Sequence, residues 1–153
     1  MIDRFERFSM AIFEISRHWH KIASDEMEKY GLKGPHCIYL LTMQQHPEGI
    51  TASALSELCG RDKADVSRMM SIMEQKGLVT KHGLPQNLYR NLLKLTEEGT
   101  AAAEHVCQRV CVAVDAAGKG LDDARRSFLY EALDLISGNL RHISQNGLPP
   151  ANM

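Results

Sequence analysis

The sequence predicts a mainly α-helical chain with one small β-hairpin. Apolar residues recur at helical spacing near both ends of the chain, which favours two long helices. In the middle, two short segments suited to β-strands flank the turn-forming stretch "GLPQN", which favours a hairpin. With 153 residues, of which 44% are hydrophobic and 24% charged, we expect one domain over residues 1–153.

A long amphipathic helix is predicted at each end, in residues 1–30 and within residues 97–146. The apolar spacing of three and four residues is typical of helices that pack on other helices. These two helices could pack on each other within one subunit, or across a two-fold axis to build a homodimer. The residues in question are Phe5, Phe8, Ile12, Ile15, Trp19, Ile22, Leu129, Leu133, Ile136, Leu140 and Ile143.

Three shorter helices are predicted between them. "PHCIYLLTMQQH" reads as a buried helix that ends before Pro47. "ITASALSELC" begins at a capping Thr51, and we expect Leu55 and Leu58 to point inward. "GRDKADVSRMMSIMEQKG" places Val66, Met70 and Met73 on one helix face and stops at Gly77.

Two strands, "LVTKH" and "YRNLLKL", follow, and then the helix "TEEGTAAAEHVCQRVCVAVDAA" and the hinge "GKGLDD" into the last helix. A short helix, a turn containing Gly60, a second helix and a hairpin make a winged helix-turn-helix. We therefore predict this motif in residues 34–96, flanked by the long N- and C-terminal helices as dimerisation helices.

The charge distribution singles out the same region. Residues 61–94 contain seven basic and three acidic residues, a net charge of +4, while the whole chain has a net charge of −1. A basic segment within an otherwise acidic chain indicates an anionic partner that binds at this segment.

Two aspartates in "GRDKADVSRMM" raise the alternative of an acid/base site. Asp62 suits the N-cap of the second helix, and Asp65 follows three residues later, an arrangement like a capping box. Both acids then complement the helix dipole. Because the chain also lacks a Gly-rich phosphate loop, GxSxG and HExxH, we predict that it is not an enzyme.

The exposed face of the second helix suits double-stranded DNA. Ala64, Ser67 and Ser71 allow close approach to base edges, and Arg68 can reach guanine or a phosphate. Lys63 lies where helix amides already favour a phosphate. A protein-interaction module on a winged helix is the competing class, and steep salt dependence of duplex binding separates the two.

The blocks "ITASALSELCGRDKADVSRMMSIMEQKGLV" and "LLKLTEEG" resemble the MarR family of bacterial transcriptional regulators. The resemblance implies a homodimer on palindromic DNA, the recognition helix in the major groove, the wing near the minor groove, and a possible small-molecule effector. We expect a cytoplasmic repressor rather than an activator. The DNA-binding residues expected are Thr51, Ser53, Arg61, Lys63, Ala64, Ser67, Arg68, Ser71, His82, Asn87, Tyr89, Arg90 and Lys94; those of the effector pocket are Trp19, Ile22, Tyr39 and Met43.

The wing departs from the family pattern. An Asp-Arg-Arg-type run usually occupies its tip, whereas alignment back from Leu95 puts Asn87 and Tyr89 in that run and Arg90 one position late. We hypothesise that wing contacts contribute less sequence specificity here than in typical members. Loss of discrimination between operator and random DNA in Arg90→Ala, but not in Arg68→Ala, would refute this hypothesis.

The four cysteines form no disulfide framework, so we expect a reduced chain. Cys107 and Cys111 lie four residues apart on one predicted helix, which leaves open a metal- or redox-sensing regulator. Space filling in helix packing is the commoner role of such cysteines. We expect no cofactor, no metal site, no signal peptide and no membrane-spanning segment.

Overall fold

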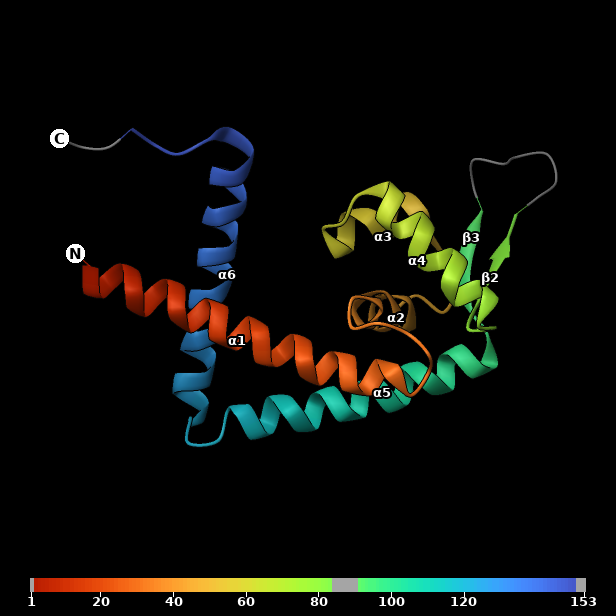
Figure 1. Cartoon of the computed structure of the whole chain (residues 1–153), viewed down its shortest axis with the longest axis horizontal. Coiled ribbons are helices and arrows are strands. Elements are labelled where there is room, and N and C mark those ends of the chain that lie inside the picture. The colour runs from red at the N-terminus through yellow and green to blue at the C-terminus, as the bar shows by residue number, and fades with distance from the viewer. Residues whose placement is uncertain (1, 84–90, 151–153) are drawn as a thin grey trace. The chain divides into compact units, whose positions relative to one another are not determined.

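A computed structural model describes residues 2–83 and 91–150 of the chain (Figure 1). The chain divides into two compact units, residues 1–112 and residues 113–153, which are described separately. The helices are α1 (Ile2–Glu28), α2 (His36–Gln44), α3 (Ala52–Cys59), α4 (Lys63–Gln75), α5 (Glu97–Ala117) and α6 (Asp123–Asn146); the strands are β1 (Ile50–Thr51), β2 (Val79–His82) and β3 (Leu92–Leu95). The predicted mainly helical class with a small hairpin is confirmed.

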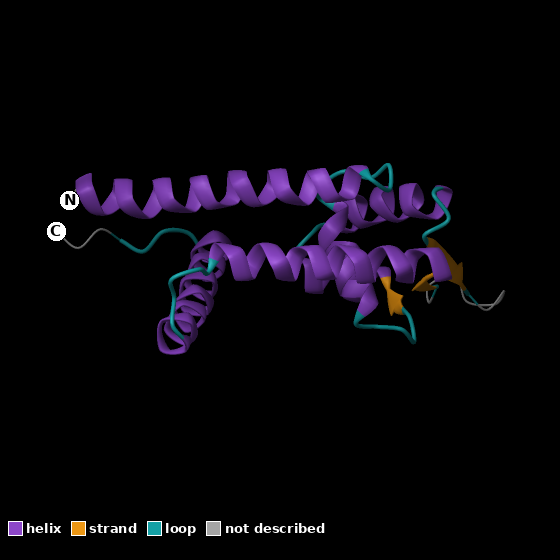
Figure 2. Ribbon diagram, turned by 90° about the horizontal axis from the view of Figure 1, so that it is seen from below, coloured by secondary structure: helices purple, strands orange, loops and turns teal. Residues whose placement is uncertain are grey.

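The strands make one antiparallel sheet in the order β1-β3-β2, seen in orange in Figure 2. β2 and β3 are the predicted hairpin and pair Val79 with Leu95 and His82 with Leu92. β1 was not expected, and it pairs Ile50 with Leu93 on the other edge of β3. The segment that leads into α3 is thereby fixed to the hairpin.

Helices α2, α3 and α4 gather beside the hairpin strands around one apolar core (Figure 1). Val66, Met70 and Met73 are buried, as predicted from their spacing, and they hold α4 to this core. The prediction for Leu58 is wrong, because its side chain is 59% exposed while Cys59 is buried. Leu55 and Cys59 are four residues apart and share the inner face of α3, and Leu58 therefore falls outside it.

The start of α5 lies close to the end of the helix-turn-helix. Thr96 donates from its hydroxyl to the Gly77 carbonyl at 2.6 Å, and its oxygen accepts from the Gly99 N–H at 3.0 Å. Gly99 is buried, and a Cβ there would overlap the Leu78 carbonyl oxygen. A glycine at this position therefore permits close packing of α5 on the chain that follows α4.

Helix α1 keeps a long apolar face in contact with solvent. Phe8, Ile12 and Ile22 are each more than 40% exposed, and Ile15 is 69% exposed. The predicted seam residue Phe5 lies outside the residues whose side chains are described. In the second unit, α6 is capped by Asp122, whose carboxylate accepts from the Arg125 N–H at 2.8 Å, and it buries none of its residues. Among the described residues, no helix is both long enough and apolar enough to cross a membrane.

Candidate nucleic-acid interface

The turn between α3 and α4 is built by local rules. Gly60 ends α3 with φ of 61°, the left-handed conformation that glycine adopts without strain. Arg61 then donates its N–H to the Ser56 carbonyl at 3.0 Å. Asp62 caps α4, and its carboxylate accepts from the Asp65 N–H at 2.7 Å. The predicted N-cap is confirmed, and it fixes where the exposed face of α4 begins.

That face carries the residues predicted to meet DNA. Lys63, Ala64, Ser67 and Arg68 are all exposed. Ala64, Ser67 and Arg68 lie away from the buried residues of α4, and Lys63 is exposed in its first turn. Ser71 is half-buried and donates its hydroxyl proton to the Ser67 carbonyl at 2.9 Å. The face is therefore an exposed helix surface with the long cation Arg68 among small side chains, and with Lys63 at its start.

Asp65 does not complete the capping box expected from its spacing. Among the described contacts, its carboxylate accepts from the Tyr39 hydroxyl at 2.7 Å and from the Arg68 guanidinium at 3.3 Å. The Tyr39 hydrogen bond, followed by the charges of Arg61 and Arg68, lowers the pKa of Asp65 against the opposing effect of burial. Burial, together with the same bond, raises the pKa of Tyr39 well above its usual range. Asp65 is therefore an ionised acceptor beside the predicted reading arginine.

The α3 residues expected to hold phosphates lie at its start. Thr51 is the predicted N-cap, confirmed by the Ala54 N–H that donates to its hydroxyl oxygen at 3.2 Å. Because that oxygen acts as an acceptor, the hydroxyl proton remains free to meet a phosphate. Ser53 is exposed in the first turn of α3.

In the hairpin, the described residues supply several polar groups. His82 is exposed, with Nε2 2.8 Å from the Thr80 hydroxyl, and Lys94 is half-buried. Lys81 forms an ion pair with Glu74 at 2.8 Å, which links β2 to α4. Asn87, Tyr89 and Arg90 lie outside the described residues, so the wing hypothesis stays a prediction.

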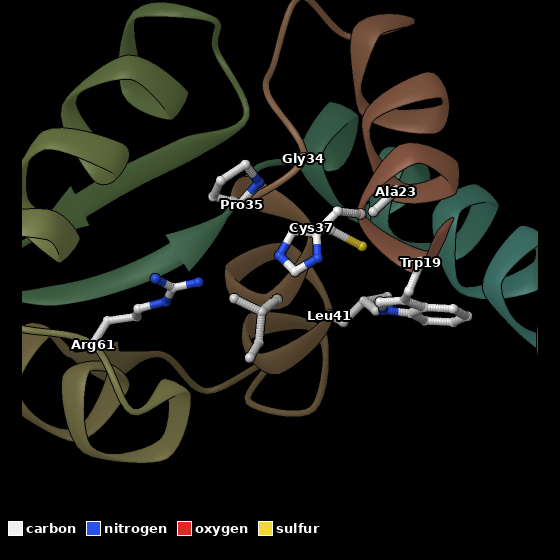
Figure 3. A pocket seen from close by; sticks show the side chains of 9 residues that line it. Trp19, Ala23, Gly34, Pro35, Cys37, Leu41 and Arg61 are labelled. Carbon is white, nitrogen blue, oxygen red and sulfur yellow. The ribbon is translucent and has the colours of Figure 1, made fainter. Parts of the chain in front are cut away.

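A pocket of about 250 Å³ lies between α1, α2 and the turn before α4 (Figure 3). The Trp19 ring and the Arg61 guanidinium lie on opposite sides of it, with Pro35, Cys37 and Leu41 between them. Of the four residues expected to line an effector pocket, Trp19 does so here. Tyr39 and Met43 are instead fully buried in the core, and Ile22 is not among the lining residues.

The cysteines separate into two classes. Burial raises the pKa values of Cys37 and Cys59. Cys107 is half-buried and Cys111 is exposed, and both line an open pocket of α5 with Gln44 of α2. Within residues 2–83 and 91–150 there is no group of three His, Cys, Asp or Glu side chains placed to hold a metal ion.

Two functional features were missed from the sequence. Arg61 was assigned to DNA, yet it also borders the pocket. Tyr39 was assigned to the pocket, yet its hydroxyl donates to Asp65 of α4. A tyrosine in a predicted buried helix is expected to have a hydrogen-bond partner, and this expectation could have drawn attention to Tyr39. The sequence does not identify the partner, because Asp65 lies 26 residues further along the chain.

This chain is similar in sequence and in structure to known proteins. Residues 30–86 match the model of the MarR family. A MarR family transcriptional regulator from Listeria monocytogenes, solved in complex with a 26mer DNA, has 23% sequence identity and a TM-score of 0.80, with 94% of this chain and 97% of that chain covered. A MarR transcriptional regulator from Methanosarcina mazei has 20% identity and a TM-score of 0.76, covering 90% of this chain and 92% of that one.

A third solved structure carries a small molecule. CouR from Rhodococcus jostii, bound to p-coumaroyl-CoA, has 19% identity and a TM-score of 0.71, with 84% of this chain and 90% of that chain covered. At these identities the likeness to the three structures establishes the fold.

Proposed function

Since the chain belongs, through residues 30–86, to the MarR family of transcriptional regulators, we propose that it binds a palindromic operator as a homodimer and represses transcription. Proteins of this family are regulators and not enzymes. The observation that carries the proposal is the exposed face of α4, where Ser67 and Arg68 project away from the buried Val66, with Lys63 exposed in the first turn. A helix held in this way can enter the major groove without disturbing its core.

Each residue of the face has a proposed role. Arg68 reads guanine, and Ala64, Ser67 and Ser71 allow close approach to base edges. Phosphates are held by Lys63 and Arg61, and by the hydroxyls of Thr51 and Ser53. His82 and Lys94, together with Asn87, Tyr89 and Arg90, serve the wing.

The test begins with the genomic DNA fragments that the purified protein retains, which are sequenced to identify a palindromic site. Arg68→Ala is expected to weaken binding to that site by about 5- to 150-fold and to relax its sequence preference, because a bidentate guanine contact is lost. Arg125→Ala is the matched control, since Arg125 pairs with Asp122 three residues away on α6 as Arg68 pairs with Asp65. Equal losses in the two variants, or binding that does not weaken with salt, would contradict the proposal.

We propose residues 34–96 as the DNA-binding part, and residues 1–30 and 97–146 as the dimerisation helices of a cytoplasmic regulator. Support comes from the exposed apolar residues of α1 and from α6, where Phe128, Leu133 and Leu135 are 72%, 47% and 66% exposed. Apolar residues at helical spacing that remain in water indicate an interface with another helix.

The oligomeric state tests this assignment. Ile15→Glu and Leu133→Glu are expected to shift the protein from dimer to monomer in size-exclusion chromatography with light scattering. Leu58→Glu is the control, because it places the same charge on an exposed leucine of α3, outside the proposed dimer helices. A monomeric wild type, or a Leu58→Glu variant that dissociates equally, would overturn it.

We further propose that a small effector binds the pocket between Trp19 and Arg61 and releases the DNA. The facing indole and guanidinium suit a ligand with a flat apolar body and an anionic group. Such a ligand would touch both α1 and the turn that starts α4, and could therefore change the position of the recognition helix.

Trp19 is the single tryptophan of the chain, so its fluorescence reports occupancy of the pocket directly. p-Coumarate and benzoate are expected to change the emission, and the neutral benzamide to do so less. In Arg61→Ala this preference for the acids should disappear. Emission changes of equal size for acids and amide in the wild type would contradict the anionic class.

A further inference from the structure

An acid lies beside the predicted reading arginine of the recognition helix. Asp65 is in the first turn of α4, and its side chain is 17% exposed, while that of Arg68 is 73% exposed. The Arg68 guanidinium donates to Asp65 Oδ1 at 3.3 Å. The cation proposed to read guanine therefore already has an anionic partner within its own helix.

The Asp65 carboxylate is held in this position from the core. Its second oxygen, Oδ2, accepts from the hydroxyl of Tyr39, which is completely buried in α2. Because this hydrogen bond comes from a fully buried side chain, it favours the same position of Asp65 when the exposed Arg68 side chain moves. The charged or titratable groups that influence Asp65 are Tyr39 and His36 of α2, Arg61 of the turn, and Arg68.

We propose that Asp65 is a specificity-determining residue that competes with DNA phosphates for Arg68, and that Tyr39 is the positioning residue that holds Asp65 for this role. The proposal rests on the DNA-binding function proposed above. A phosphate of random DNA offers Arg68 a charge contact similar to the one it already has, so exchange gains little. A guanine edge offers two directed hydrogen bonds, so exchange is favourable at the correct base.

The competition predicts a selective effect of removing the charge. Asp65→Asn should tighten binding to a random duplex by about three- to tenfold at low salt, because Arg68 becomes available to one more phosphate. The slope of log K against log salt should steepen by about one for the same reason. Binding to the retained operator should change less, so the ratio of specific to random affinity falls.

Asp25→Asn is the matched control, since Asp25 is an exposed acid of α1 that pairs with Lys21 at 2.7 Å. It removes the same charge from the protein but leaves Arg68 unchanged, and the ratio of affinities should stay at the wild-type value. Circular dichroism and urea unfolding establish that both variants are folded.

The double variant Asp65→Asn/Arg68→Ala tests whether Asp65 acts through Arg68. The gain in affinity for random DNA should vanish in the Arg68→Ala background. A gain of the same size in both backgrounds would mean simple repulsion between Asp65 and DNA, and would overturn the competition. Unchanged or weaker random binding in Asp65→Asn would also overturn it.

Tyr39→Phe tests the positioning role through a pH profile. Without the hydroxyl, the pKa of Asp65 should return toward its ordinary range, so the loss of discrimination on acidification should begin at a higher pH than in the wild type. A structural role alone would lower affinity at every pH without moving the profile. If discrimination in Tyr39→Phe is lost over the same pH range as in the wild type, Tyr39 has no positioning role.

The two proposals fail in distinguishable ways. If the wild type binds neither retained fragments nor random duplex, the DNA-binding function itself is wrong. If the wild type binds with specificity and Asp65→Asn keeps that specificity, only the role of Asp65 is wrong.

Discussion

The hydroxyl of Thr96 donates to the carbonyl oxygen of Gly77 at 2.6 Å, and this bond joins the start of α5 to the turn that follows α4. The Thr96 N–H donates to the Leu78 carbonyl at 3.0 Å, so backbone and side chain of one residue hold the same segment. The same hydroxyl oxygen accepts from the Gly99 N–H and caps α5. One side chain therefore links the segment that follows α4 to the start of α5.

Replacing Thr96 by valine should lower the free energy of unfolding by about 1–2 kcal/mol, because a helix cap and a hydrogen bond across the fold are both lost. Urea unfolding measures the difference. Thr100→Val is the matched control, since the exposed Thr100 hydroxyl donates only to the Thr96 carbonyl one turn earlier in its own helix. The control should lose less than about 0.5 kcal/mol. A loss in Thr100→Val as large as that in Thr96→Val would contradict the linking role.

Gly99→Ala should destabilise the protein by about 1–3 kcal/mol, because the new methyl group would overlap the Leu78 carbonyl oxygen, which is backbone and cannot move aside cheaply. Gly138→Ala provides the comparison within α6, where an added Cβ meets no atom within 4 Å. There the substitution should stabilise by about 0.5–1 kcal/mol, since alanine favours a helix interior. Thermal unfolding of both variants at equal protein concentration checks the opposite signs.

Protonation of Glu26 should account for part of the loss of stability of the fold in acid. It accepts from Lys29 at 2.6 Å and from Arg109 of α5 at 3.3 Å, and these bonds, that of Lys29 first, hold its pKa below the ordinary 4.5. A carboxylate whose pKa is lowered by folding contributes its full stabilisation of the fold at pH values above its pKa in the unfolded chain. This contribution is lost as the pH falls through its pKa in the folded protein.

Glu26→Gln should therefore lower the free energy of unfolding by about 1 kcal/mol at pH 7, and the difference from the wild type should shrink as the pH falls below the ordinary value of 4.5. Asp25→Asn, in an exposed pair, should change stability by less than about 0.5 kcal/mol at either pH. A Glu26→Gln deficit that is equally large at pH 3 would mean that charge is not the cause.

The thiols should react in two groups. Because burial raises the pKa values of Cys37 and Cys59 and shields both sulfurs, iodoacetamide at pH 8 should label them at least about tenfold more slowly than Cys107 and Cys111. Peptide mass spectrometry after short pulses measures the four rates. In urea the rates should converge, and a difference that persists there would have a cause other than the fold.

The local parts of the structure could be predicted from the sequence. Thr51 and Asp62 act as caps because the N–H three residues later is fixed by the helix that follows. Val66, Met70 and Met73 are buried because helical spacing alone puts them on one face.

The parts that depend on distant contacts could not be predicted in this way. β1 has only two residues, and its pairing of Ile50 with Leu93 joins segments that are far apart in the chain. The inward position on α3 belongs to Cys59, which donates to the Thr42 hydroxyl at 3.5 Å, and Leu58 is left outside. Tyr39 was expected at the effector pocket because it lies on the second predicted helix, but its partner on α4 became known only from the fold.

Helix α6 buries none of its residues, and this has a consequence for the amount of protein in the cell. A helix without a buried face derives little stability from its own sequence and depends on whatever lies against it. In the homodimer that we propose, a second molecule covering α6 would stabilise the fold by mass action, so the melting temperature should rise with protein concentration. The expression level would then determine the folded fraction of the protein as well as its total concentration. When synthesis stops, the concentration of folded protein would fall more steeply than the total concentration.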